Sequence, residues 1–124
     1  MRILGLGVDL ADIDRVEDVL EKYPRFAQRC FTQHEQEYAG KFAKPGRRLA
    51  ARFAGKEAVM KSLGTGWRRL RWTDVEITGG GKPTVRLYND AAKHAEVMGV
   101  TEVLVTITHT DTTALVMAVA VGEH

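Results

Sequence analysis

The segment from Arg48 to Leu63 constrains the fold most, because it combines a long helical pattern with a carboxylate on the apolar side. Its apolar residues recur at helical spacing, and Gly64 stands where a glycine commonly ends a helix. Glu57 lies four residues after Phe53 and three before Met60, which places it along the apolar stripe. A carboxylate in that position costs free energy unless it is paired, protonated or bound to a metal.

Two carboxylates of the chain have more than one interpretation. Glu57 either forms an ion pair with Lys61 one helical turn later or is a metal ligand at the floor of a cleft. Asp9 ends the apolar segment 2–9, which is a predicted strand. It is either a turn or cap residue or a binding residue at the end of that strand. Two carboxylates from separate elements suit Mg²⁺, which commonly takes one or two carboxylates, water and substrate phosphates.

A third candidate, His109, ends a predicted strand beside the polar loop 110–113. A histidine there can bind phosphate or move a proton, or it can be a neutral, hydrogen-bonded residue of a strand end. Asp111 in the same loop assists His109, contacts a neighbouring subunit or is a polar turn residue. The other histidines are predicted to lie at the surface: His34, His94 and His124.

Hydrophobic periodicity and turn residues predict the order of the elements. Strands are expected at 2–9, 72–78, 84–88, 102–109 and 114–121. Helices are expected at 12–23 with Asp12 as the cap, at 33–42 after a capping-box pattern at 32–35, and at 48–63. A last helix is expected up to 98, from a cap at Asn89 or Asp90 to Gly99, which closes it. Breaks are expected at Pro24, at 45–46 and at 79–83. The resulting order, β-α-α-α-β-β-α-β-β, predicts an α+β fold with a mainly antiparallel sheet and packed helices.

Length and composition limit the class of protein. The 124 residues, 44% of them hydrophobic, suffice for one domain over 1–124 with a core of its own. The longest apolar run, 114–121, is far shorter than the ~20 residues of a membrane span, so no membrane association is expected. Cys30 is the only cysteine, which excludes an intrachain disulfide, favours a cytoplasmic location and predicts a small core residue.

Charge is distributed unevenly along the chain. The stretch 41–71 has ten basic residues and the single acid Glu57, so it carries +9, while the whole chain carries only +2. The ten are Lys41, Lys44, Arg47, Arg48, Arg52, Lys56, Lys61, Arg68, Arg69 and Arg71. Such a surplus favours an anionic ligand, namely phosphates, nucleic acid or an acidic protein, although a solvated basic face has the same composition.

Three segments together resemble one family, the holo-[acyl-carrier-protein] synthases, which are the short type of 4′-phosphopantetheinyl transferase. They read ILGLGVDL at 3–10, RFAGKEAVMK at 52–61 followed by LGTG at 63–66, and VTITH at 105–109. Gly81, Lys82 and Pro83 add a weaker fourth match. The resemblance spans nearly the whole chain, and its segments occur in the right order.

This resemblance implies a 4′-phosphopantetheinyl transferase-like fold and transfer of the phosphopantetheine arm of coenzyme A to a serine of apo acyl carrier protein, leaving adenosine 3′,5′-bisphosphate. It implies that Asp9 and Glu57 hold Mg²⁺ with the pyrophosphate and that Lys61 contacts the phosphates. It further implies that Arg52 and His109 lie near the nucleotide and that 81–83 borders the adenosine. The family is usually a homotrimer with each active site between two subunits, so the same assembly is implied here.

Three points stay open at this stage. The proton of the serine can go to Glu57, to a magnesium-bound water or to His109, and a water activated near Glu57 is favoured. The family docks its acidic carrier on basic residues of the first helix; here Arg15, Lys22 and Arg29 are spaced by sevens amid several acids. The alternative functions are a small basic nucleic-acid-binding module, for which no standard motif is present, and a non-catalytic trimer that binds carrier protein.

Overall fold

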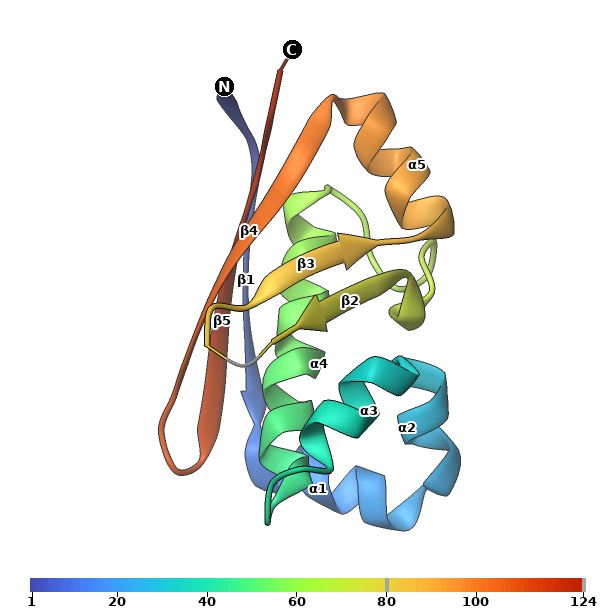
Figure 1. Ribbon diagram of the computed structural model, residues 1–124, viewed down its shortest axis with the longest axis vertical. Coiled ribbons are helices and arrows are strands. Elements are labelled where there is room, and N and C mark those ends of the chain that lie inside the picture. Colours follow the sequence, from blue (N-terminus) through green and yellow to red (C-terminus); the bar gives the residue numbers. More distant parts are fainter. Residues whose placement is uncertain (80, 124) are drawn as a thin grey trace.

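The strands form two antiparallel sheets in the computed structural model, which describes residues 1–79 and 81–123 (Figure 1). The larger sheet has the strand order β1-β5-β4, with bounds Arg2–Asp12, Thr113–Gly122 and Val100–His109. The smaller sheet pairs β2, Val75–Thr78, with β3, Thr84–Leu87. β5 is therefore the central strand of the larger sheet, and β1 and β4 are its two edges.

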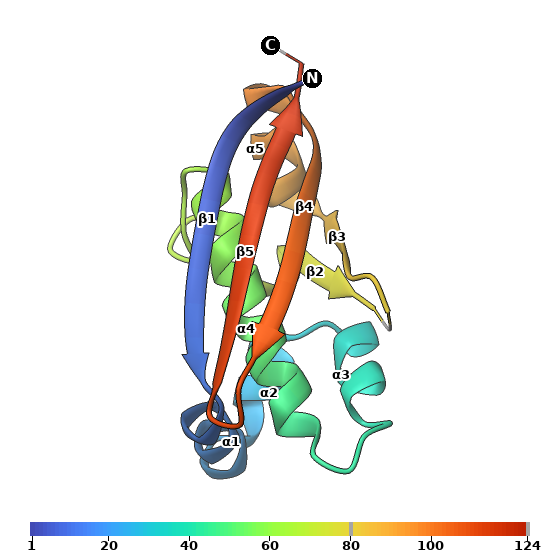
Figure 2. The ribbon, with the colours of Figure 1, turned by 90° about the vertical axis from the view of Figure 1, so that its left-hand side faces the viewer.

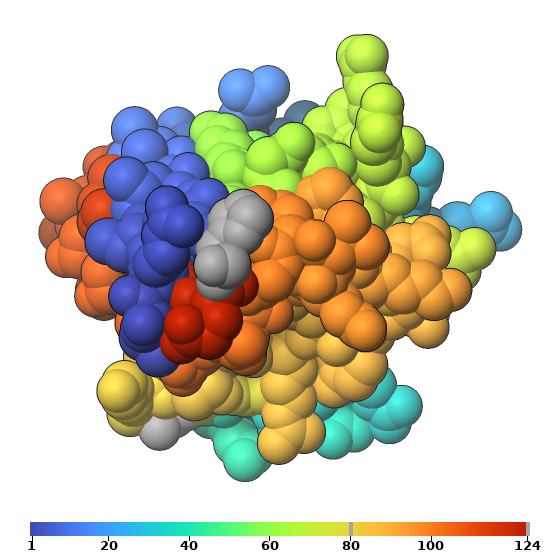
Figure 3. Space-filling view, turned by 90° about the horizontal axis from the view of Figure 1, so that it is seen from above, coloured from blue at the N-terminus to red at the C-terminus, as the bar shows by residue number. Residues whose placement is uncertain are grey.

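One long helix, α4 (Pro45–Ser62), packs across a single face of the larger sheet (Figure 2). The first three helices gather around the N-terminal half of α4: α1 (Ile13–Lys22), α2 (Pro24–Cys30) and α3 (Gln33–Ala39). The smaller sheet and α5 (Asn89–Met98) lie towards its other end. Seen from above, the first residues lie beside the last strand (Figure 3), and the Met1 amino group is 3.3 Å from Glu123 Oε1.

Two glycines of β1 set how closely α4 approaches the sheet. A Cβ atom on Gly5 would collide with the carbonyl oxygen of Ser62, and one on Gly7 would collide with that of Ala58. Because side chains alternate along a strand, Asp9 points to the same inner face as these glycines. The close contact of backbone with backbone therefore brings the Asp9 carboxylate against α4.

The predicted α+β class and antiparallel pairing are confirmed, and several boundaries are corrected. β1 continues to Asp12, so Asp9 lies within a paired strand and does not end it. Residues 72–74 form a 3-10 helix, η1 (Trp72–Asp74), because the Asp74 side chain accepts a hydrogen bond from the Arg71 amide and tightens the turn. The proline at 45, predicted to break the chain, starts α4, since its fixed φ suits the first helical turn.

Four smaller predictions concern the end of α3, the cap of α5, His94 and Cys30. Helix α3 ends at Ala39, earlier than the predicted residue 42. The N-cap position of α5 is occupied by Tyr88, which forms no side-chain cap. Asn89, one of the two predicted caps, instead donates a hydrogen bond from its side chain to Asp74. His94 is half-buried, with Nε2 2.7 Å from the Leu63 carbonyl oxygen, so it is not a surface residue. Cys30 lies in the core as predicted. Gly80 and His124 lie outside the described residues.

Candidate active site

A charged cluster lies where β1 meets α4. Lys61 Nζ is 2.9 Å from Asp9 Oδ1 and also donates to the Val8 carbonyl oxygen at 3.1 Å. Glu57, one helical turn before Lys61, is half-buried, and burial together with the nearby negative charge of Asp9 raises the pKa of its carboxyl group. The ion pair between Glu57 and Lys61 that was one interpretation of the sequence does not form; Lys61 pairs with Asp9.

The donor set of this cluster fits a hard divalent cation. Two neighbouring carboxylates supply oxygen ligands, and a cation between them would relieve their mutual repulsion. Within residues 1–79 and 81–123, no group of three or more His, Cys, Asp or Glu side chains could hold a metal. A two-carboxylate site of this kind leaves coordination positions for water and for phosphate oxygens, which is how proteins commonly bind Mg²⁺.

A second candidate region is a basic cavity of about 480 Å³ between α4, α3 and the end of β4. Its lining includes Arg47, Arg48, Arg52 and His109, together with Gly81 and Pro83 of the β2–β3 turn. The structure thus brings together four residues that the sequence assigned to the nucleotide: Arg52, Gly81, Pro83 and His109. Lys82, predicted with them, is exposed in the turn and does not line the cavity.

His109 lines this cavity, and Asp111 follows it in the loop after β4. His109 is exposed, and its Nδ1 atom is 3.4 Å from the Thr110 carbonyl oxygen, a contact too long to fix the ring. Asp111 Oδ1 is 4.0 Å from Arg47 Nη2 and fully exposed. Neither residue contacts the Asp9 cluster, so the structure of one chain does not join His109 to the two carboxylates.

The two regions lie on different sides of α4 and at different edges of the sheet. Asp9 is on the edge strand β1 and His109 on the edge strand β4, with β5 between them. Along α4, Arg52 lines the cavity, whereas Glu57 and Lys61 do not. A single chain therefore carries two separate half-sites, one acidic with a lysine and one rich in arginine.

Comparison with known proteins decides the family. A family model described as the 4′-phosphopantetheinyl transferase superfamily matches residues 5–119. The chain belongs to this superfamily. A holo-[acyl-carrier-protein] synthase of Solibacter usitatus is 45% identical over 98% of this chain and 99% of its own length. A second, of Moorella thermoacetica, is 45% identical over 86% of this chain and 85% of its own length. The chain is an enzyme of this synthase type.

Solved structures of the family share the fold. An acyl carrier protein synthase of Plasmodium yoelii with ADP bound has a TM-score of 0.88 and 31% identity, covering 99% of this chain and 98% of the other. A holo-(acyl-carrier-protein) synthase of Bacillus anthracis in complex with CoA (3′,5′-ADP) has a TM-score of 0.79 and 26% identity, covering 98% of each chain. The predicted resemblance is therefore confirmed at the level of family and fold.

One buried ion pair of this transferase was not predicted from its sequence. Lys56 Nζ lies 2.7 Å from Glu35 Oε1, and both side chains are fully buried. Lys56 also donates to the carbonyl oxygens of Trp72 and Val75, while Glu35 accepts from the amides of Thr32 and Ile77. The capping-box pattern of 32–35 was visible in the sequence, but it does not indicate a lysine partner from another helix.

The burial of Lys56 removes it from the solvated face that was one interpretation of the basic stretch, whereas six of the ten basic residues of 41–71 are exposed. Arg52, only 4% exposed, is withdrawn from the surface as well. The docking face considered at Arg15, Lys22 and Arg29 stays a prediction, but these residues do not share one helix: the chain breaks between α1 and α2, so the spacing by sevens does not place them on one face. Lys22 is in addition paired with Asp18 at 3.1 Å.

The outer face of the larger sheet of this transferase is apolar and uncovered by other elements of the chain (Figure 2). Met117 at its centre is 41% exposed, and its cross-strand neighbour Val8 is 52% exposed. The other large exposed hydrophobic residues on these strands are Ile3, Leu6, Leu10 and Leu104. A contiguous exposed apolar surface of this kind is typical of an interface.

Among the helices that the structure describes, none combines the length and the apolar character that a membrane crossing needs.

Proposed function

We propose that this chain transfers 4′-phosphopantetheine from coenzyme A to a serine of apo acyl carrier protein in a Mg²⁺-dependent reaction. The serine oxygen forms a bond to the phosphorus that bears the pantetheine arm, and the bridging bond of the pyrophosphate breaks. Adenosine 3′,5′-bisphosphate leaves, and the serine gives up its proton. The observation that carries this proposal is the cluster of Asp9, Glu57 and Lys61 where β1 meets α4.

Each residue of the cluster has a distinct role in the proposal. Asp9 and Glu57 would hold Mg²⁺, which when bound neutralises the negative charge on the pyrophosphate. Lys61, anchored on Asp9 and on the Val8 carbonyl oxygen, is placed to contact phosphate oxygens as a point charge. Of the two side chains considered as bases, Glu57 lies in this cluster and His109 does not, which favours a water near Glu57 as the proton acceptor.

We further propose that the enzyme is a homotrimer whose sites lie between subunits. Two observations support this. The acidic half-site and the arginine-rich half-site are separated within one chain, so a neighbouring chain is needed to bring them together. The apolar outer face of the larger sheet supplies a surface that association would bury. Coenzyme A would then span the two half-sites, with Arg52, Gly81, Lys82, Pro83 and His109 near its nucleotide.

The protein partner in this proposal is an acyl carrier protein, as the names of the relatives suggest, and the resemblance implies that it is acidic. Arg15 on α1 and the two arginines of α2, Arg25 and Arg29, are the exposed basic groups of that region that have no ion pair within 1–79 and 81–123. Fatty acid synthesis in the cytoplasm is the expected setting. A nucleic-acid-binding module is disfavoured because it gives no role to the two neighbouring carboxylates, Asp9 and Glu57, beside Lys61.

Intact-protein mass spectrometry tests the reaction directly. The protein is mixed with apo acyl carrier protein, coenzyme A and Mg²⁺, and a parallel sample contains EDTA. The expected result is a mass gain of one phosphopantetheine group on the carrier that is absent with EDTA. Failure of the folded protein to modify several apo carriers would contradict the proposal, and titration of nucleic acid across salt concentrations would then test the alternative.

A further inference from the structure

Two arginine–aromatic stacks lie side by side in the basic cavity. The Arg52 guanidinium carbon is 4.3 Å from the centroid of the Tyr38 ring, and that of Arg48 is 4.0 Å from the Phe42 ring. The two rings are themselves in edge contact, with centroids 5.2 Å apart. Since the arginines are one turn apart on α4, each ring supports one arginine, and Arg48, Arg52 and Tyr38 all line the cavity.

Arg52 has an unusual environment for a charged side chain. It is 4% exposed, and its Nε atom has no hydrogen-bond partner among the described residues. The Tyr38 ring lies against the guanidinium, and Gly79 lies close as well, because a Cβ atom on Gly79 would be 3.2 Å from Arg52 Nη2. The carboxylate whose charge acts on Arg52, Glu35, is buried and already paired with Lys56. A buried cation without a counter-charge is costly, so this environment fits a site that an anion completes.

We infer that Tyr38 is a positioning residue, whose ring holds the Arg52 guanidinium ready to receive a phosphate group of coenzyme A. The identity of the ligand rests on the proposed function; the positioning of Arg52 does not. An arginine side chain is flexible, and ordering it when a ligand arrives lowers affinity. Stacking on Tyr38 orders the side chain beforehand, and the planar guanidinium then offers paired donors that match phosphate oxygens.

The location of Arg52 predicts which kinetic constant Tyr38 affects. In the proposed trimer coenzyme A spans the two half-sites, with its nucleotide at the Arg52 cavity and its reacting phosphorus at Asp9 and Glu57. On that proposal the phosphate held by Arg52 belongs to the nucleotide and is not the one that changes bonds. Loss of this contact weakens the binding of coenzyme A equally in the ground state and in the transition state. KM therefore rises and kcat is unchanged.

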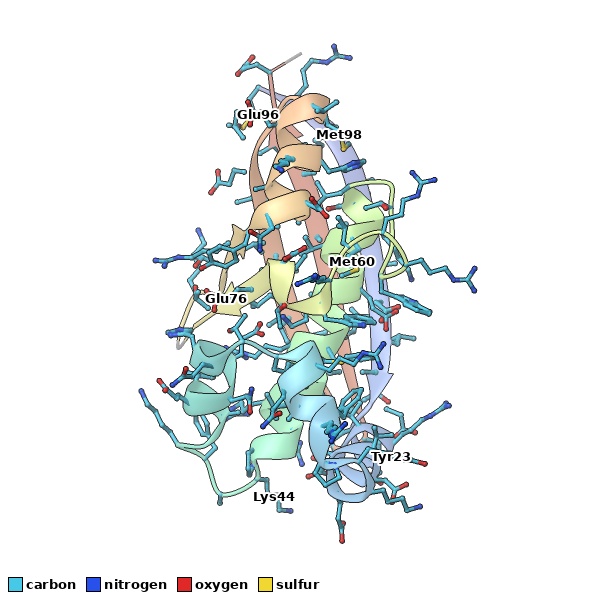
Figure 4. The ribbon with its side chains drawn as sticks, turned by 90° about the vertical axis from the view of Figure 1, so that its right-hand side faces the viewer. Tyr23, Lys44, Met60, Glu76, Glu96 and Met98 are labelled. Atoms are coloured by element: carbon cyan, nitrogen blue, oxygen red, sulfur yellow. The ribbon has the colours of Figure 1, made fainter. Side chains whose placement is uncertain are left out.

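The kinetic test compares three variants in the carrier-modification assay. Tyr38→Leu removes the ring and is expected to raise KM for coenzyme A about tenfold, with kcat within about twofold of wild type. Tyr38→Phe keeps the ring and is expected to restore KM to within about twofold. Tyr23→Leu makes the same change at an exposed tyrosine between α1 and α2 and serves as the matched control (Figure 4). If Tyr38→Leu is poorly folded, Tyr38→Met replaces it.

A spectroscopic test separates this inference from the proposed function. In NMR spectra, the Arg52 Nε–Hε signal is assigned as the one that Arg52→Lys removes. In the ligand-free protein, the Tyr38 ring is expected to shift this signal, and the proton is expected to exchange slowly with water. Both properties are expected to be lost in Tyr38→Leu. Adenosine 3′,5′-bisphosphate is the probe ligand. One outcome is that the wild type shows no transfer activity, while the probe still shifts the Arg52 signal and shifts it less in Tyr38→Leu. In that case the transfer proposal fails and the positioning role of Tyr38 stands.

Other outcomes overturn the inference while the proposed function survives. An active wild type with the same KM in Tyr38→Leu would show that Arg52 does not need the ring. Equal rises of KM in Tyr38→Leu and Tyr38→Phe would assign the effect to the hydroxyl group and not to the stack. A fall in kcat without a change in KM would place Tyr38 in the chemical step.

Discussion

Lys61 Nζ lies 2.9 Å from Asp9 Oδ1 and joins α4 to the edge strand β1 across 52 residues of sequence. This pair replaces the local one that helical spacing allows between Lys61 and Glu57. Glu57 is left beside a second carboxylate in a half-buried position, which raises its pKa. The arrangement leaves the Glu57 carboxylate free for a cation, and we expect it to be the most sensitive position of the cluster.

Replacement of that carboxylate tests its role. Glu57→Gln keeps the size of the side chain but removes its charge, and it is expected to lower the transfer rate by about a thousandfold. The rate is measured by mass spectrometry of the carrier, and circular dichroism checks that the fold is kept. Glu96→Gln, the same change at an exposed position of α5 (Figure 4), is expected to be as active as wild type. Near-normal turnover of Glu57→Gln would remove Glu57 from the mechanism.

Charge reversal on α1 tests where the acidic carrier docks. Arg15→Glu is expected to raise KM for the carrier about tenfold, because it turns an attraction into a repulsion, and to leave KM for coenzyme A unchanged. Steady-state kinetics with each substrate varied in turn measures both constants. Lys93→Glu on α5 is the control with the same change of charge. An unchanged KM for the carrier would exclude this docking face.

A charge on the outer face of the larger sheet tests the proposed trimer. Met117→Asp places an aspartate at the centre of the apolar surface, where burial of an unpaired charge is costly. The variant is expected to be monomeric in size-exclusion chromatography with light scattering, and to lose transfer activity. Val97→Asp, at an apolar side chain of α5 that is 88% exposed, should keep the assembly of the wild type. A wild type that is active as a stable monomer would contradict the trimer.

The buried pair of Lys56 and Glu35 predicts a large effect on stability. Lys56→Met leaves the Glu35 carboxylate buried without its cation and is expected to lower the free energy of unfolding by about 3–5 kcal/mol. Adding Glu35→Gln removes the stranded charge and keeps an acceptor oxygen for one of the two backbone amides that donate to Glu35, so it should recover part of the loss. Urea unfolding measures these values, with the exposed Lys93→Met as the control. A double variant no more stable than Lys56→Met would contradict this explanation.

Cys30 predicts a dependence of stability on alkaline pH. Burial raises the pKa of its thiol from 9.0 to about 11. Because the folded state holds the proton more tightly than the unfolded chain, the contribution to stability is complete below pH 9 and is lost as the pH rises towards 11. Wild type should therefore lose about 2–3 kcal/mol relative to Cys30→Ala over this range. Urea unfolding at several pH values measures the free energy of unfolding of both proteins. An equal change with pH in wild type and in Cys30→Ala would contradict the prediction.

Local signals in the sequence were enough to predict most elements of the fold. The Asp12 cap of α1 and the Thr32–Glu35 capping box of α3 both form. Gly99 ends α5 with the positive φ that favours glycine. These signals act within about one helical turn, so they are visible in a short stretch of sequence. The predicted start of the strand 72–78 was wrong, because residues 72–74 form a turn that depends on the Asp74 side chain. An alternating pattern of hydrophobic residues does not indicate such a turn.

Three motifs in the right order were enough to identify the family, and the resemblance assigned Asp9, Glu57 and Lys61 to one site around the pyrophosphate. The partner of each charge, in contrast, is visible only in the folded molecule. Tertiary packing paired Lys61 with Asp9, buried Lys56 on Glu35 and enclosed Arg52 between Tyr38 and Gly79. Such pairings depend on how α4 packs against elements far away in the chain. Close packing and the cost of burying an unpaired charge select them, and neither is visible in a local pattern.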